Sequence, residues 1–574
     1  MENKQTNNKP TKNKSNVPPM YVYALGGLGE VGKNMYVVEQ GNEIWIMDSG
    51  IKFANEVTID GIIPSFDYLV KNQKKIQGLL ITHGHEDHIG AVPHLLNAVK
   101  IPKIYAGRIA AGLIWKKTSE RRVARPKIQM INNKYTIKSQ NFKISFFNVN
   151  HSIPDSFGIA FKSKHGTVVN TGDFKFDLTP VGSRSDMSKM TQLGDQGVTL
   201  MLSDSTNSSV KTFSPSEADV RDTIDPLIKN AKGRVITATF ASNVYRVREI
   251  IKLAHKHNRK IVIFGYSMDK VVTIARKIKY INIPENFIID PRKIKNYDDK
   301  EILILSTGTQ GELNAALSKM ATGRHKQVKI NENDTVIFAS SAIPGNYEGV
   351  EVVTNELIKK GATVIDNKTN PGVHASGHGG RSEQLIMFSL LRPQHFMPVH
   401  GETVMQLEHA NTAVASGVSR KNVFILSNGG RLKIENGKVE EASSVPAADV
   451  YVDETKLTGQ SQKVISDRLT MSKNGVITVT VGIDSNKNEI IIDPVIEAKG
   501  AFSTEGAAQF MKDVSTSVKT DLQAYYKSGE KISFNGIKEV IKATTEAEVF
   551  RQRKINPVVV PIILNKQIQR SEDE

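Results

Sequence analysis

The chain contains no cysteine among its 574 residues. Disulfides and metal–thiolate bonds are therefore excluded, and any metal ion must be held by histidine and carboxylate side chains. The sequence also lacks an apolar run close to the roughly 18 residues of a membrane span. Its N-terminus lacks the apolar core of a secretory signal. These absences predict a cytoplasmic protein with no membrane association.

Positive charge predominates over negative charge. The chain has 76 Lys and Arg against 59 Asp and Glu, which gives a formal net charge of +17. Such a balance favours a polyanionic partner such as nucleic acid, although a lysine-rich surface can also serve solubility alone. Residues 1–19 are rich in Asn, Lys and Pro, with few apolar side chains. They predict a disordered basic arm.

Five side chains that can bind a metal or a proton lie within the six residues from His83 to His88. A short apolar run before them is typical of a buried strand, and the residues after them are typical of a helix start. His83 and His85 are two residues apart in extended chain, so they face the same side and can share one metal. Asp87 and His88 follow and can reach a second metal. The run therefore predicts a dinuclear site, whereas a solvated polar loop seldom concentrates such residues.

Further candidate ligands follow other apolar runs, at the ends of the strands that these runs predict. They are Asp48, His151, Asp173, Asp204 and His400. One such residue alone is more often a cap or turn residue than a ligand. Their recurrence favours a common site, because α/β folds build their sites where strand ends converge.

A glycine pattern near the N-terminus resembles a dinucleotide-binding loop. Residues Gly27 to Gly32 match GxGxxG, and Asp48 stands near the distance expected of a ribose-binding acid. That motif requires a helix after the glycines, whereas Met35 to Met47 predicts two strands around a Gly-Asn turn. The context therefore argues against a dinucleotide site.

Strands alternate with helices between residues 214 and 370, which predicts a second domain with a parallel sheet. Its strands end in small polar loops, among them Ser242-Asn243, that suit phosphate binding, although ordinary turns have similar compositions. A glycine-rich loop with two histidines follows at His374 to Gly380. Residues 441–462 predict a linker, and residues 463–574 predict strands with one helix from about Glu505 to Tyr526.

Taken together, these motifs resemble the bacterial ribonuclease J family, in the β-CASP branch of the metallo-β-lactamase superfamily. The matching segments are Ala24 to Glu30, Asp48, His83 to His88, His151 to Ser156, Thr171 to Asp177, Ser203 to Asn207, His374 to Gly380, Pro398 to Glu402 and Pro557 to Pro561. The resemblance implies an α/β fold: a metallo-β-lactamase αββα sandwich, an inserted β-CASP parallel-sheet domain and a C-terminal α+β domain. The implied bounds are 20–213 and 371–440 for the sandwich, 214–370 for the insertion and 463–574 for the last domain.

The resemblance also implies roles for individual residues. His83, His85 and His151 would hold one Zn²⁺, Asp87, His88 and His400 a second, and Asp173 would bridge both, with Mn²⁺ or Mg²⁺ as substitutes. Asp48 and Asp204 would orient histidine ligands. His378 would act at the scissile phosphate. The catalytic residues that the resemblance implies are His378, Asp87, Asp173 and Asp204. Ser242, Asn243 and the loop His374, Ala375, Ser376, Gly377 and His378 would contact RNA.

The implied activity is 5′-to-3′ exonuclease cleavage of single-stranded RNA with a 5′-monophosphate, together with endonuclease cleavage, in RNA maturation and decay. A homodimer or tetramer is expected, with or without a paralogue. The chain departs from the family at Tyr266, where Arg is usual, and at Glu454 to Lys463 and Ala498 to Phe502. Two alternatives remain open: a weakly active or non-catalytic RNA-binding paralogue, and a metallo-hydrolase of small esters.

Overall fold

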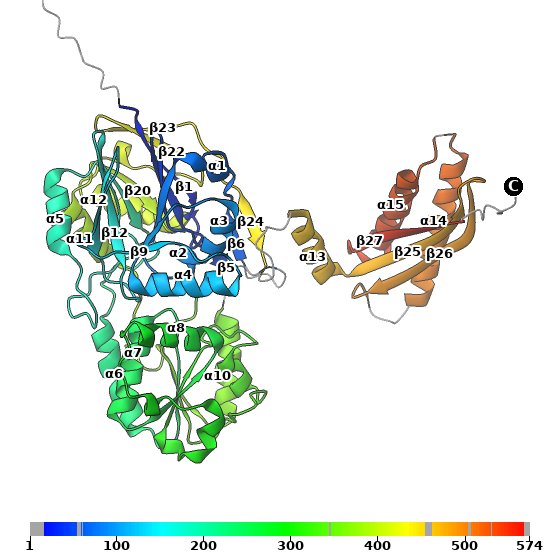
Figure 1. Cartoon of the computed structure of the whole chain (residues 1–574). Helices are drawn as coiled ribbons and strands as arrows, with labels where there is room; N and C mark the ends of the chain where they lie inside the picture. Colours follow the sequence, from blue (N-terminus) through cyan, green and yellow to red (C-terminus); the bar gives the residue numbers. More distant parts are fainter. Residues whose placement is uncertain are drawn as a thin grey trace, which may run out of the picture. The chain divides into compact units, whose positions relative to one another are not determined.

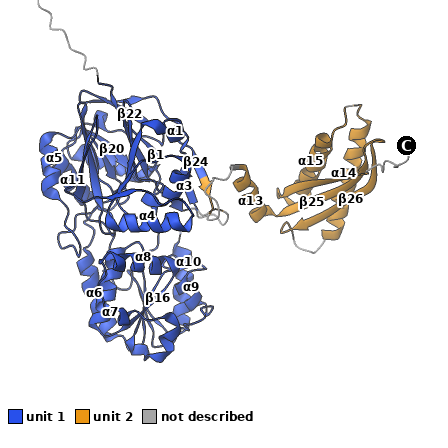
Figure 2. Ribbon diagram, in the orientation of Figure 1, with its two compact units in different colours: residues 1–53, 61–450 blue, residues 54–60, 451–574 orange. Residues whose placement is uncertain are grey.

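The computed structural model of the chain (Figure 1) describes residues 17–53, 59, 61–343, 346–453, 462–502, 507–529 and 531–566. Contacts divide the chain into two units, residues 1–53 with 61–450 and residues 54–60 with 451–574 (Figure 2). Most of the predicted basic arm, residues 1–16, lies outside the described residues. Among the helices of the described ranges, none combines the length and the apolar character that crossing a membrane requires.

Two large sheets form the sandwich domain of the first unit. The order of the eight-stranded sheet is β23-β22-β1-β3-β4-β7-β8-β9. Its strands are β1 (Met20–Gly26), β3 (Met35–Gln40), β4 (Glu43–Met47), β7 (Ile76–Leu80), β8 (Ile104–Ala106), β9 (Ile128–Met130), β22 (Arg431–Glu435) and β23 (Lys438–Ala442). The order of the six-stranded sheet is β10-β11-β12-β13-β14-β20. Its strands are β10 (Thr136–Lys138), β11 (Lys143–Asn148), β12 (Phe157–Ser163), β13 (Gly166–Asn170), β14 (Leu200–Asp204) and β20 (His395–Val399).

Smaller elements complete the sandwich domain. They are β2 (Leu28–Gly29), β5 (Lys52–Phe53), β6 (Gly61–Pro64), β21 (Gly401–Glu402), α1 (Asp67–Lys71), α2 (Glu86–Ile89), α3 (Val92–Ala98), α4 (Arg108–Glu120), α5 (Met187–Gln196), α11 (Arg381–Leu391) and α12 (Thr403–Ala415). Residues 27–32 are followed by the antiparallel strands β3 and β4 rather than by a helix. The prediction of two strands around the Gly-Asn turn is therefore confirmed.

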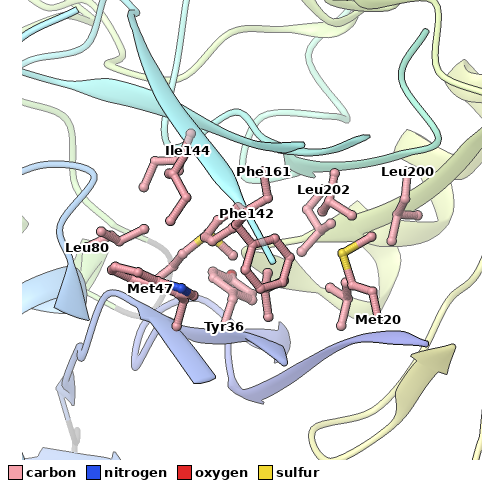
Figure 3. Close-up of a cluster of buried hydrophobic side chains, with 14 of the residues drawn as sticks. Met20, Tyr36, Met47, Leu80, Phe142, Ile144, Phe161, Leu200 and Leu202 are labelled. Carbon is pink, nitrogen blue, oxygen red and sulfur yellow. The ribbon is translucent and has the colours of Figure 1, made fainter. Parts of the chain in front are cut away.

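The sandwich core lies between the facing sheets (Figure 3). Met20, Tyr36 and Met47 come from the eight-stranded sheet, while Ile144 and Phe161 come from the six-stranded sheet. Side chains on the other face of the six-stranded sheet pack against α5, α11 and α12. Alternate residues of a strand point to opposite faces, so each central strand of this sheet contributes to two cores.

The inserted domain, residues 217–365, has a five-stranded sheet of order β16-β17-β15-β18-β19 with every pair parallel. Its strands are β15 (Val235–Ala238), β16 (Lys260–Phe264), β17 (Ile302–Ser306), β18 (Thr335–Phe338) and β19 (Thr363–Ile365). Its helices are α6 (Glu217–Asn230), α7 (Val244–Lys256), α8 (Tyr266–Lys277), α9 (Ala316–Ala321) and α10 (Tyr347–Lys359). Parallel strands covered on both faces favour continuous apolar sequence, and β17 is buried along its whole length. The predicted parallel sheet is confirmed.

The second unit contains a three-stranded sheet of order β26-β25-β27. Its elements are α13 (Gln462–Asn474), β25 (Val476–Asp484), β26 (Glu489–Lys499), α14 (Ala507–Lys527), α15 (Phe534–Arg553) and β27 (Val558–Asn565). One face of β25 packs on α14 and α15 through side chains that include Val479, Val518 and Ile541.

One expectation about this part of the chain was wrong. A single helix was expected, but α13 and α15 are present as well. The buried residues of α15 recur every fourth position from Ile537, a helical period that the sequence displays. Residues 441–462 include the end of β23 and all of β24 (Asp449–Val452), and residues 454–461 lie outside the described part. The two units divide within this segment, between residues 450 and 451, and its role as a linker stays a prediction.

Replacing Phe161 by Ala should destabilise the sandwich domain by about 3–5 kcal/mol, because it leaves a cavity between the sheets. Phe161 is fully buried and its ring lies edge-on to Phe142, with centroids 5.7 Å apart. Urea unfolding measures the loss. The control is Leu178→Ala, since Leu178 is 70% exposed and its loss should cost less than about 0.5 kcal/mol. Equal effects of the two substitutions would contradict the described packing.

Candidate metal centre

The candidate ligands converge because their strands end at one edge of the sandwich. β13, β14 and β20 are parallel neighbours, so Asp173, Asp204 and His400 emerge side by side from their carboxyl ends. His83 to His88 follow β7 and pass into α2. Asp48 and His400 have φ of 61° and 50°, a left-handed conformation that non-glycine residues hold only under constraint. Sharp turns at the strand ends therefore point these side chains toward one place.

One group consists of His83, His85, His151 and Asp173. Nδ1 of His85 lies 3.0 Å from Nε2 of His83 and 3.0 Å from Nε2 of His151. Oδ2 of Asp173 lies 3.5 Å and 3.8 Å from the Nε2 atoms of His83 and His151. Three imidazole nitrogens and one carboxylate oxygen thus face a common centre, which is the donor set of a tetrahedral metal site.

The second group consists of Asp87, His88, Asp173 and His400. Nε2 of His88 lies 3.2 Å from Oδ2 of Asp173 and 3.5 Å from Oδ2 of Asp87. Nε2 of His400 lies 3.1 Å from the same oxygen of Asp87. Oδ2 of Asp173 therefore faces both groups, the position that the family resemblance implies for a bridging carboxylate.

Each of the five histidines uses its other ring nitrogen for a further hydrogen bond, which in four of them points away from the centre and in His400 goes to the candidate ligand Asp173. His85 donates to the carbonyl of Ser242 and His151 to that of Gly377. His88 donates to Asp48 over 2.8 Å, while His83 donates to Thr82 and His400 to Asp173. Once a cation displaces any proton on the inner side, these bonds favour the tautomer whose unprotonated nitrogen faces inward.

Burial and the nearby carboxylates shift the pKa values of the candidate histidine ligands in opposite directions: those of His83, His85 and His151 are lowered, and those of His88 and His400 are raised. Burial lowers the pKa of His83, His85 and His151, which favours the neutral imidazole that a metal requires. Burial also acts on His400, but the carboxylates of Asp173 and Asp87 outweigh it and raise the pKa of His400 to about 10. The carboxylates thus favour positive charge at the centre.

Two buried atoms at this centre lack a hydrogen-bond partner among the described residues: Oδ2 of Asp173 and Nε2 of His400. Buried polar atoms are normally paired, because an unpaired one costs free energy. Both atoms face the positions that the surrounding nitrogens and oxygens leave for an ion. The residues present therefore fit divalent metal.

His378 and Asp204 form a pair next to both groups. Nδ1 of His378 donates to Oδ2 of Asp204 over 2.7 Å, and its ring centroid lies 4.9 Å from that of His151 and 5.6 Å from that of His400. Burial lowers the pKa of His378, but Asp204 outweighs it, so the net shift is upward. Since 21% of its side chain is exposed, solvent or substrate can reach His378.

The structure also shows where the expected RNA-contacting residues lie. Asn243 is buried; its side chain caps α7 and donates to Glu217. His374 accepts a hydrogen bond from Arg246, and Ala375 is buried. The side chains of Asn243, His374 and Ala375 contact other residues of the protein. Contact of these residues with RNA remains a prediction. Ser242, Ser376, Gly377 and His378 are partly exposed.

Sequence reasoning did not find Glu217, Arg246 and Glu383. Arg246 and Glu217 are an ion pair inside the inserted domain, and Glu383 accepts backbone N–H bonds from Phe176, Ser214 and Gly380. All three are charged residues on helices, where the sequence alone predicts that a charged side chain faces solvent. Their burial depends on long-range packing that no local pattern displays.

Family models match four parts of the chain. They are Metallo-beta-lactamase superfamily at residues 28–148, Ribonuclease J, beta-CASP domain at 232–357, Zn-dependent metallo-hydrolase RNA specificity domain at 370–426 and Ribonuclease J C-terminal domain at 463–566. The sandwich and its histidine–aspartate groups thus define a metal-dependent hydrolase of the metallo-β-lactamase superfamily.

Relatives narrow this class. Ribonuclease J of Mycoplasma pneumoniae is 40% identical over 554 residues, which are 95% of this chain and 97% of that protein. Ribonuclease J 1 of Streptococcus pyogenes is 39% identical over 95% of this chain and 97% of its own length. The chain belongs to the ribonuclease J family, and is a metal-dependent nuclease that binds RNA. A crystal structure of a protein of unknown function from Enterococcus faecalis, 14% identical with a TM-score of 0.50, covers 74% of this chain and all of that chain and shares the fold.

Replacing Asp48 by Asn should weaken divalent metal binding about 10- to 100-fold, because His88 loses the acceptor that sets its tautomer. Asp48 accepts hydrogen bonds from His88 and from Thr82, both within 2.8 Å. Competition with a chromophoric chelator measures the affinity. Asp334→Asn is the control, since Asp334 is equally buried but pairs with Arg234 in the inserted domain. If both variants bind metal as the parent does, Asp48 has no part in orienting the ligand.

Proposed function

We propose that the chain is a zinc-dependent ribonuclease with two ions per subunit, which degrades single-stranded RNA from a 5′-monophosphate end and also cleaves internally. The observation that carries the proposal is the convergence of seven candidate ligands on one centre, with the His378–Asp204 pair beside it. One ion would be held by His83, His85 and His151. The other would be held by Asp87, His88 and His400, and Asp173 would contact both ions. The five imidazoles favour Zn²⁺; Mn²⁺ is an acceptable substitute, and Mg²⁺ a poorer one because it prefers oxygen ligands.

Metal ions held by these residues would supply an activated water molecule and offset negative charge on the phosphate oxygens. The protein's own residues would do the remaining work. His378 would protonate or stabilise the leaving 3′-oxygen from its free Nε2, since its Nδ1 is held by Asp204. Asp204 would keep that ring in the tautomer and charge state required for donation.

A basic segment beside the site supports RNA as the substrate. Residues 116–127, at the end of α4 and just after it, contain six Lys or Arg and one Glu. The guanidinium of Arg125 lies over the ring of Trp115 at 4.5 Å, and Tyr266 on the neighbouring helix α8 is 69% exposed. Positive charge with accessible aromatic rings is typical of surfaces that bind single strands. A small ester would not require such a surface, which disfavours an esterase.

We further propose that the protein acts in the cytoplasm, in RNA maturation and decay. We also propose that it assembles as a homodimer or tetramer. In the second unit, β27 presents Val560, Ile562 and Leu564 with 39–50% of each side chain exposed. Exposed apolar side chains on one strand favour a protein partner, and a second copy of the chain, or a paralogue, meets that need.

The proposal is tested with end-labelled RNA carrying a 5′-monophosphate or a 5′-hydroxyl, with and without chelator. We expect metal-dependent hydrolysis, faster on the monophosphate, and mononucleotide products from the 5′ end. Asp87→Ala should lower the rate about a hundredfold or more. Asp290→Ala should leave it unchanged, since Asp290 is a partly exposed carboxylate of the inserted domain that pairs with Arg292. RNA binding without hydrolysis by the metal-loaded parent would support a non-catalytic subunit instead.

His378→Ala should lower kcat about 10²- to 10⁴-fold while metal content stays that of the parent, because His378 acts on the leaving group rather than on the ions. Single-turnover kinetics and elemental analysis of the same preparation measure the two quantities. The control is His257→Ala, since His257 pairs with Asp225 in the inserted domain. Loss of metal together with activity would make His378 a ligand instead.

A further inference from the structure

Arg246, on α7 of the inserted domain, is 1% exposed and uses all five of its N–H groups. Nε and Nη2 donate to the carboxylate of Glu217. Nη1 donates to the carbonyl of Ala339 over 2.8 Å and to Nδ1 of His374 over 2.7 Å. Nη2 also donates to the carbonyl of Ala375 over 2.9 Å. A guanidinium with every donor paired holds its partners in one geometry.

Two of these partners, His374 and Ala375, begin the loop that reaches the candidate metal centre. Two residues further, the carbonyl of Gly377 accepts the Nδ1–H of His151 over 2.7 Å. His378 follows directly, and its carbonyl accepts hydrogen bonds from Asn207 and Ser214. The loop anchored by Arg246 therefore orients one candidate ligand and supplies the imidazole that acts on the substrate.

The loop has little room to adopt another conformation. A Cβ placed on Gly377 would lie 2.8 Å from the ring of His151. The side chain of Ala375 is buried, and that of His374 is held by Arg246. Burial lowers the pKa of His374 to about 3, so its Nδ1 remains an acceptor for the guanidinium. A shift at the Arg246 end would be transmitted to the position of Gly377.

We propose that Arg246 is a positioning residue through which the inserted domain sets the orientation of His151 and His378. Its pairing with Glu217 offsets the cost of burying its charge. Asn243 donates to the same carboxylate and accepts the backbone N–H of Arg246, which joins the start of α7 to the network. The inference rests on the proposed function, because it assigns His151 to the metal and His378 to the reaction.

The test is the double variant Arg246→Met with Glu217→Gln, which removes both buried charges together and keeps side chains of similar length. We expect metal affinity to fall about tenfold for one of two ions and kcat to fall about 10- to 100-fold, with a smaller change in KM. Chelator competition and steady-state kinetics on 5′-monophosphorylated RNA measure these quantities. Arg246→Lys keeps the charge but not the five bonds, and should lie between parent and double variant.

Arg259→Met is the matched control. Arg259 is also a buried arginine of the inserted domain, 4% exposed, and donates to the carbonyls of Gly233, Ala231 and Ile302, none of which belongs to the loop. If Arg246 positions the site, Arg259→Met lowers the melting temperature while metal affinity and kcat stay those of the parent. The inference would be overturned if all variants bound metal as tightly as the parent. It would also be overturned if Arg259→Met and the double variant lost metal affinity and kcat to the same extent. A parent that binds no divalent metal or leaves RNA intact would instead refute the proposed function.

Discussion

The buried carboxylate of Asp173 is the feature on which the candidate centre depends. One of its oxygens lies within 3.8 Å of imidazole nitrogens from both ligand groups, and has no hydrogen-bond partner of its own among the described residues. A carboxylate buried without compensating charge is strongly unfavourable, so the surrounding groups must supply positive charge or hold a cation. The five histidines around it meet this requirement only if their inner nitrogens are free to bind. The outward hydrogen bonds of His83, His85, His88 and His151 favour that condition.

Much of this arrangement could be predicted from local sequence. A metal ligand at a strand end is visible as a polar residue after an apolar run, which is how Asp48, His151 and Asp173 stood out. Parallel strands with short apolar sequences also predict which ends share an edge, as for β13, β14 and β20. The candidate ligands therefore follow from period and position, whereas their division into two groups came from the family resemblance.

The remaining parts depend on contacts between distant segments. Arg246 and Glu217 have the composition of a helix surface, and only the packing of α6 and α7 against the loop after residue 373 buries them. The same holds for the carbonyls of Ser242 and Gly377, because a backbone acceptor carries no sequence signature. The failure to predict α15 from the sequence has a different cause. Its four-residue period is present in the sequence, but its Lys, Thr and Glu content obscures the apolar stripe.

The point of insertion explains why a second domain can affect chemistry at the centre. The chain leaves the sandwich after Asp204 and returns at the loop before α11, and these two junctions form adjoining walls of the site. Asn207, on the outgoing junction, donates to Ser376 and to the carbonyl of His378 on the returning one. Asp204 and His378 form the side-chain pair between the same two segments. Movement of the inserted domain relative to the sandwich would change the separation of the junctions and with it the position of His378. If the domain were inserted elsewhere on the sandwich, the centre would remain, but the position of His378 would not depend on the inserted domain.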